Sequence, residues 1–112
     1  MKVQKEINKE TFPQLYREML VKRNTEGVKH TNVKDGEWPF KVTEGTLHRI
    51  GNCIFFECIY SGVFKRHSLF AINGTAIMNR KHYNAKKLPK RLRLYHNISA
   101  VNDIIEYGNE ME

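Results

Sequence analysis

Acidic residues are missing from a long internal part of this chain. Between Glu57 and Asp103 there is no Asp or Glu, although the 112 residues contain 12 acids in total. The same stretch contains nine of the 19 Lys and Arg residues, so the net charge of +7 comes wholly from it. Segregation of one sign of charge favours a polyanionic partner. We therefore expect nucleic acid, or an acidic protein surface, to bind residues 58–102.

Features that identify several other classes of protein are also absent. No apolar run approaches the roughly 18 residues of a membrane span, and MKVQKEINKE lacks the apolar core of a signal peptide. There is no Gly-rich phosphate loop and no CxxC pair. Cys53 and Cys58 lie in CIFFECIY, where their odd spacing along a strand points them to opposite faces. We expect a cytoplasmic protein with reduced cysteines, no metal or cofactor, and no membrane partner.

The length and composition suit one folded domain. A chain of 112 residues, 40% hydrophobic and 11% aromatic, can bury a core without disulfides or a structural metal. We expect a single domain over residues 1–112, in which residues 1–10 and 109–112 are loose ends. Its oligomeric state does not follow from the sequence.

Two amphipathic helices are predicted, one near each end of the chain. TFPQLYREML places Thr11 at an N-cap position and Gln14 three residues later, as in a capping box, ahead of an apolar stripe at helical spacing. AVNDIIEY has the same spacing, with Ser99 or Asn97 as its cap and Gly108 as its stop.

The middle of the chain has the composition of an antiparallel sheet. Four runs rich in β-branched and aromatic residues are separated by Gly51-Asn52, Ser61-Gly62 and Asn73-Gly74, which are two-residue turn signals. Asn-Gly is the strongest of them, because both residues tolerate the positive φ angles of a type I′ turn. The predicted fold class is α+β, a four-stranded antiparallel β-meander packed against the N-terminal and C-terminal helices.

The stretch FKRHSLFAINGTAIMNRKHY, residues 64–83, reads almost the same from both ends. If Asn73-Gly74 closes a hairpin, Phe70 faces Ile77 near the turn and the basic residues meet at the far end. The predicted pairs are Arg66 with Lys81, His67 with Arg80, Lys65 with His82, and Glu57 of the preceding strand with Arg66. Like charges in cross-strand contact destabilise a sheet by up to about 1 kcal/mol per pair. A basic cluster kept at that cost indicates a function.

A second basic segment, KKLPKRLR, follows this stretch directly. Pro89 disfavours a continuous helix through it, so its cations are expected on a loop or an extended strand beside the hairpin. A continuous positive surface gains affinity by releasing counterions from a phosphate backbone. The predicted nucleic-acid-binding residues are Lys65, Arg66, His67, Arg80, Lys81, His82, Lys86, Lys87, Lys90, Arg91 and Arg93.

The type of nucleic acid is suggested only by what surrounds the cations. There is no helix-turn-helix pattern, zinc-finger spacing or RNP1-type motif. Phe56 and Tyr60 are expected on the same sheet face as the uncompensated cations, where aromatic rings can stack on bases. The alternative is that these rings belong to the core. The pattern slightly favours RNA or single strands over duplex DNA.

Two alternative functions remain open. A first helix, the stretch FAINGTAIM and then KKLPKR resemble small toxins of the RelE/ParE type, a resemblance that implies an endoribonuclease. The likeness is confined to these parts, and the spacing from the lysines to the proline is shorter than in those families. The residue types needed for acid-base chemistry are present at His67, His82, His96, Tyr83 and Arg80, but no residue is assigned as catalytic.

The other alternative is a modulator that binds an acidic surface of a host protein, such as a polymerase or a nucleoid protein. Trp38 in GEWPF is then an anchor presented by a loop. Against this, Trp38 and Phe40 can equally close one end of the core. Co-purifying nucleic acid distinguishes the two binding hypotheses.

Overall fold

The protein is an α+β structure with a five-stranded mixed sheet and three helices among the described residues. The computed structural model describes residues 2–23, 35–61, 65–88 and 98–111, apart from the side chains of residues 60–61, 65–67 and 98–100. In chain order the elements are β1 (Lys2–Asn8), α1 (Phe12–Arg23), β2 (Glu44–Ile50), β3 (Cys53–Ser61), β4 (Lys65–Ala71), α2 (Gly74–Met78), β5 (Lys86–Lys87) and α3 (Ile98–Asn109).

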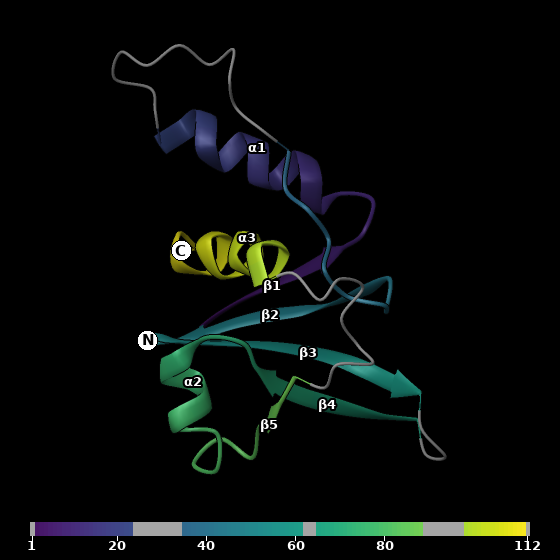
Figure 1. Ribbon diagram of the computed structural model, residues 1–112, viewed down its shortest axis with the longest axis vertical. Helices are drawn as coiled ribbons and strands as arrows, with labels where there is room; N and C mark the ends of the chain where they lie inside the picture. The colour runs from purple at the N-terminus through teal and green to yellow at the C-terminus, as the bar shows by residue number, and fades with distance from the viewer. Residues whose placement is uncertain (1, 24–34, 62–64, 89–97, 112) are drawn as a thin grey trace.

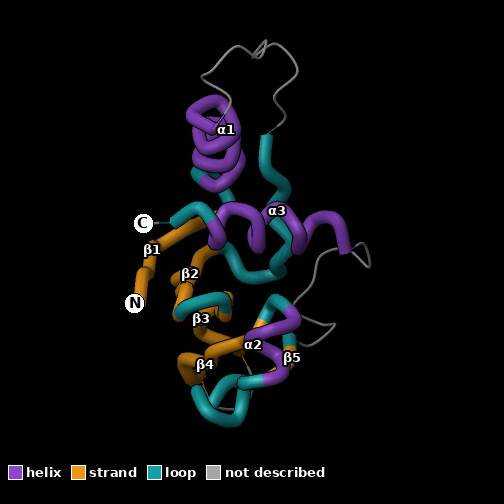
Figure 2. The backbone as a smooth tube through the Cα atoms, turned by 90° about the vertical axis from the view of Figure 1, so that its left-hand side faces the viewer, coloured by secondary structure: helices purple, strands orange, loops and turns teal. Residues whose placement is uncertain are grey.

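The sheet lies between two helical layers. Its strand order is β1-β2-β3-β4-β5, antiparallel except for β5, which runs parallel to β4. Helices α1 and α3 lie on one face and α2 on the other (Figures 1 and 2). Because β3 is the middle strand and is covered on both sides, its consecutive residues Phe55 and Phe56 are both fully buried, one in each core. This burial explains the nearly continuous apolar run CIFFECIY.

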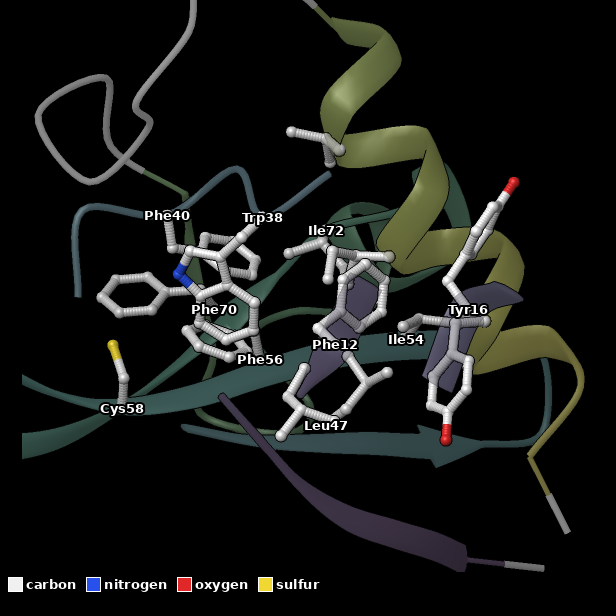
Figure 3. Close-up of a cluster of buried hydrophobic side chains, with 14 of the residues drawn as sticks. Phe12, Tyr16, Trp38, Phe40, Leu47, Ile54, Phe56, Cys58, Phe70 and Ile72 are labelled. Carbon is white, nitrogen blue, oxygen red and sulfur yellow. The ribbon is translucent and has the colours of Figure 1, made fainter. Parts of the chain in front are cut away.

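The larger core is rich in aromatic side chains. Phe40 stacks on Phe56 with ring centroids 3.9 Å apart, and Trp38 meets both rings edge-on at 5.4 and 6.0 Å (Figure 3). Phe12 and Tyr16 of α1 close the other end of this cluster. Each aromatic pair contributes about 0.5–1.5 kcal/mol beyond its buried area. Trp38, only 5% exposed, is therefore a core residue and is not presented on a loop as a partner anchor.

The two cysteines confirm the predicted alternation along β3. Cys58 packs in the larger core and Cys53 in the smaller one, and both are free and buried. Burial, with a contribution from the nearby Glu57 carboxylate, raises the pKa of the Cys58 thiol to about 11. The Cys58 thiol thus stays protonated at neutral pH.

The N-terminal residues form a strand, whereas the sequence predicts a loose end. β1 pairs with β2 along its whole length, from Lys2 opposite Ile50 to Asn8 opposite Glu44. Only Ile7 of this strand is fully buried, because an edge strand is covered on one face at most. The polar sequence KVQKEIN therefore lacks the apolar alternation that would identify it.

Of the three predicted two-residue turns, only the first is confirmed. Gly51-Asn52 closes a hairpin in which Ile50 pairs with Cys53. At the next turn Ser61 pairs with Lys65, so three residues intervene. The register of β4 against β3 therefore differs by three residues from the predicted one. Because this number is odd, each described side chain of β4 lies on the opposite face of the sheet from the predicted one.

Glu57 consequently lies opposite Leu69, and not opposite Arg66 as the sequence predicts. Its carboxylate instead accepts a hydrogen bond from His48 Nε2 at 3.0 Å. Arg66 pairs along the backbone with Tyr60. The predicted cross-strand pair of Glu57 with Arg66 is therefore wrong.

Both predicted helices form, but by different local contacts. The Thr11 carbonyl accepts the first helical hydrogen bond from Leu15 N, while Gln14 bonds to Glu18 and does not form a capping box. Helix α3 continues through Gly108 to Asn109. A Cβ at Gly108 would lie 2.8 Å from Ile54 Cδ1, so only a glycine leaves room for this contact. The glycine thus permits close packing and does not stop the helix.

Of the two predicted caps of α3, one is wrong and the other is not tested. Ser99 lies inside the helix, and Asn97 lies outside the described residues. None of the helices in the described ranges has both the length and the apolarity needed to cross a membrane.

Candidate functional site

Asn73-Gly74 starts a helix, although the sequence predicts a hairpin turn at this point. The backbone of Asn73 is extended, with φ of −112° and ψ of 168°, as is usual for an N-cap residue. Its side-chain oxygen accepts hydrogen bonds from Ala76 N at 2.9 Å and Ile54 N at 3.2 Å. Its amide donates to Asn52 O at 2.8 Å. One side chain therefore ties the start of α2 to β3 and to the preceding turn.

The segment after α2 crosses to the edge of the sheet. Arg80 donates to the carbonyl of Ile77 at 2.7 Å, and its own carbonyl accepts from Ala85 N at 2.7 Å. Asn84 turns the chain with a φ of 54°. β5 then joins β4 in parallel, with Lys86 beside Phe70 and Lys87 beside Ala71. The predicted fourth antiparallel strand over residues 75–83 is therefore wrong.

This topology removes the predicted cross-strand pairs of basic residues. Lys81 and His82 are exposed in the turn after α2, and β4 pairs on one side with β3 and on the other with β5. Phe70 faces Phe56 across the ladder, and Ile77 lies in α2. The pairing of Arg66, His67 and Lys65 with residues 80–82 is therefore wrong.

The structure gathers only part of the predicted binding set at one described surface, which we call the basic end. Lys81, His82, Lys86 and Lys87 are exposed there, and Arg80 is half-buried beside them. Lys65, Arg66 and His67 occupy the start of β4, where only their backbone is described. Lys90, Arg91 and Arg93 lie outside the described residues.

The basic end has no acidic neighbours among the residues that the structure describes. No ion pair is found there for Lys81, Lys86 or Lys87, and the guanidinium of Arg80 is held by a carbonyl. Residues 58–102, which supply this end, also contain no acid. A positive potential at this end is therefore not neutralised internally.

Other side chains at the basic end offer apolar and aromatic surface. Met78, at the end of α2, is 85% exposed. His82 meets the edge of Tyr83 at 4.9 Å, and Tyr83 in turn packs on the buried ring of Phe55 at 5.2 Å. The predicted hairpin over residues 64–83 gave no sign of this exposure. Phe56, predicted as a possible stacking platform, is fully buried in the larger core.

The basic end is an open surface. Two grooves of about 570 and 710 Å³ occur in the described structure, and no residue of the basic end lines either one. Among the described residues there is also no cluster of three His, Cys, Asp or Glu side chains suited to a metal ion. An open cationic surface suits a long polyanion better than a small ligand.

Three of the residues considered for ribonuclease chemistry, Arg80, His82 and Tyr83, lie in the turn after α2, where the His82 ring meets Tyr83 at 4.9 Å. Arg80 is held by Ile77 O, and Tyr83 packs on Phe55. The side chain of His67 is not described, and His96 lies outside the described residues. No family model, curated protein or solved structure matches this chain.

Proposed function

We propose that the protein binds nucleic acid through the basic end, with further contacts from the cations of residues 65–67 and 90–93. The supporting observation is the exposure of Lys81, Lys86 and Lys87 at the sheet edge without an acidic neighbour in the described structure. Exposed ammonium groups act as mobile point charges that contact phosphates irrespective of sequence. Binding is therefore expected to depend strongly on charge and only weakly on the nucleotide sequence.

RNA or single strands are the proposed targets ahead of duplex DNA. The only described helix at the basic end is α2, whose five residues are too few to enter a major groove as a recognition helix. An exposed sheet edge with Met78 and Tyr83 nearby can instead accept unstacked bases beside a phosphate track. Recognition by this surface depends on backbone charge and on accessible base faces.

A salt series with matched variants tests this function. Replacing Lys81, Lys86 and Lys87 with Ala should weaken binding to RNA and flatten the salt slope by roughly 0.7 to 0.9 for each phosphate that these lysines neutralise. The matched control replaces the exposed cations Lys9 and Lys41, which lie away from the basic end, and should leave the slope unchanged. Fluorescence anisotropy against RNA, single-stranded DNA and duplex DNA measures both quantities.

The two sets remove three and two charges, so equal losses of affinity per lysine replaced would show that only the total charge matters. Unchanged affinity in both sets would remove the nucleic-acid proposal. The alternative of an acidic protein partner then takes its place, since exposed Met78 beside lysines provides an apolar contact ringed by charge. In that case affinity for an acidic polypeptide such as polyglutamate should depend on the same three lysines.

The endoribonuclease alternative ranks below nucleic-acid binding in this proposal. β1 precedes the first helix, and FAINGTAIM comprises the end of β4, the cap Asn73 and α2 instead of a hairpin. Two of the three features that carry the resemblance to RelE/ParE-like toxins are thus not formed, and the third, KKLPKR, lies partly outside the described residues. Incubation of the protein with labelled RNA should leave the RNA intact.

A further inference from the structure

The outer edge of β1 carries backbone groups that no described strand pairs with. β1 is the first strand in the sheet order, so β2 is its only neighbour among the described strands. Lys9 N donates to Thr43 O at 2.8 Å, and this bond continues the β1–β2 register by one further pair. Since antiparallel partners alternate between hydrogen-bonded and non-bonded pairs, the odd residues of β1 bond to β2.

The even residues of β1 consequently direct their N–H and C=O groups away from the sheet. These residues are Lys2, Gln4, Glu6 and Asn8, of which the first three are also exposed. The two-residue turn at 51–52 supports this alternation. Ile50 and Cys53 form the hydrogen-bonded pair that closes the hairpin, so the even residues of β2 bond to β3 and its odd residues bond to β1. An unpaired edge of seven residues is a template for a further strand.

A groove runs alongside this edge, between β1, α1 and the end of α3. Its volume is about 570 Å³. Its apolar wall includes Val3, Leu15, Met19 and Met111, none of which is fully exposed. Both signs of charge also line it, from Lys5, Lys22, Arg23, Glu18 and Glu110. A strand added to β1 would therefore have apolar surface on the α1 side of the sheet to cover.

We propose that a second copy of this chain occupies the edge, with the two β1 strands antiparallel across a two-fold axis at Gln4. Such an axis perpendicular to the sheet keeps each face continuous, so only residues of like parity can lie opposite each other. With the axis at Gln4, Lys2 lies opposite the partner subunit's Glu6, and Glu6 lies opposite the partner subunit's Lys2. The strand is thus complementary in charge to itself, and the two Gln4 amides meet at the centre.

Other registers are less favourable for identifiable reasons. An axis at Lys5 places two like charges opposite each other, and its backbone pairs would join Gln4 to the partner subunit's Glu6 without an ion pair. A slip by one residue exposes the apolar face. Lysines on an edge strand usually deter such pairing. Here the opposing Glu6 side chains remove that repulsion, which favours this partner over an unrelated strand.

The interface is expected to be modest in size. We expect strand pairing and the covered groove together to bury less than the roughly 800 Å² per partner that a stable interface typically buries. We therefore expect a dimer that forms in the micromolar range or above. It also leaves the basic end uncovered, because β5 lies at the opposite edge of the sheet. Dimerisation and nucleic-acid binding can thus be tested separately.

Sedimentation equilibrium and amide exchange test the proposed dimer. Mass should rise with concentration from 13.2 kDa toward twice that value. The amides of Gln4 and Glu6 should gain protection from exchange over the same concentration range, because they are bonded only in the dimer. A mass that stays at 13.2 kDa to the solubility limit overturns the proposal. A dimer without added protection at these two amides overturns it too.

Three variants identify the edge and its register. Gln4→Pro removes an outward N–H and should abolish the dimer, whereas the control Gln4→Thr keeps that donor and should dimerise. Lys2→Glu and Glu6→Lys should each weaken the dimer, and the double variant should restore it at low salt. Dimerisation that survives Gln4→Pro, or charge exchange without rescue, overturns the pairing. Unchanged amide exchange in β2 confirms that each variant is folded.

Discussion

The α1–α3 side and the basic end of this protein handle positive charge in opposite ways. On the first side, Arg17 lies 3.4 Å from Asp35, and Arg23 pairs with Glu106 and Glu110. At the basic end, no described lysine has an acid within ion-pair distance. The two cores also differ in size. The larger one lies under α1 and α3, and the smaller one lies under α2. Stability is concentrated on one side, and uncompensated charge on the other.

The largest expected effect of a substitution is in the larger core. Phe56→Ala should lower the free energy of unfolding by about 3–5 kcal/mol, because Phe56 is fully buried and contacts Trp38 and Phe40. Chemical denaturation measures this loss. Phe55→Ala opens the smaller core instead, and should lower amide protection around α2 more than in α3. Equal losses of protection in both helices would show that the two sides unfold as one unit.

A smaller loss of stability is expected at Asn73, which ties the start of α2 to β3 and to the turn at 51–52. Asn73→Ala removes the cap of α2 and should cost about 1–2 kcal/mol. Asn73→Asp keeps the oxygen that accepts from Ile54 and Ala76 but loses the donor to Asn52 O, so it should recover part of the loss. Denaturant midpoints of the three proteins give the ranking. An unchanged midpoint in Asn73→Ala would refute the capping role.

Alkaline pH should lower the stability of the protein through two groups on the α1–α3 side. Burial raises the pKa of Cys58 from the ordinary 9.0 to about 11, so folding favours the protonated thiol. Its contribution is complete below pH 9.0 and is lost as the pH rises through about 11. Tyr16, whose pKa is raised by burial and by the hydrogen bond to Glu106, acts with the same sign. Thermal unfolding of Cys58→Ala should therefore show a shallower, but not flat, decline across this range.

The smallest effects come from single surface charges. Arg23→Ala should cost at most about 1 kcal/mol, because its ion pairs are partly exposed. Lys87→Ala should change stability by less than about 0.5 kcal/mol, since this exposed lysine has no ion pair among the described residues. Paired thermal melts at low and high salt measure both. A clear loss of stability from Lys87→Ala would show that the basic end contributes to folding.

The sequence predicts the periodic elements of this fold well. The apolar spacing from Phe12 to Leu20 becomes α1, and that around Ile104 becomes α3. The odd spacing of Cys53 and Cys58 gives the two faces of β3 correctly. These predictions succeed because helical and strand periodicity depend only on which residues are buried.

Asn73 shows why the rest was not predictable. Asn is favoured both in tight turns and at helix N-caps, so the local sequence permits either structure. The contacts that favour the cap reach Ile54 and Asn52, and are invisible in a local pattern. The prediction of a positive region within residues 58–102 does not depend on this turn, because it was inferred from composition. Its cross-strand partners do not, because they were inferred from the turn.

The dependence of the sheet on α3 bears on how the protein is made in the cell. Leu47, Ile54 and Phe56 lie on the face of the meander that α3 helps to cover, and Ile54 lies under Gly108. Residues 98–109 leave the ribosome after every strand they cover. Until then, a nascent chain with paired strands presents a wide aromatic and aliphatic surface to its surroundings. We expect chains arrested before α3 to associate with chaperones or to aggregate, even though their local strand pairings are complete.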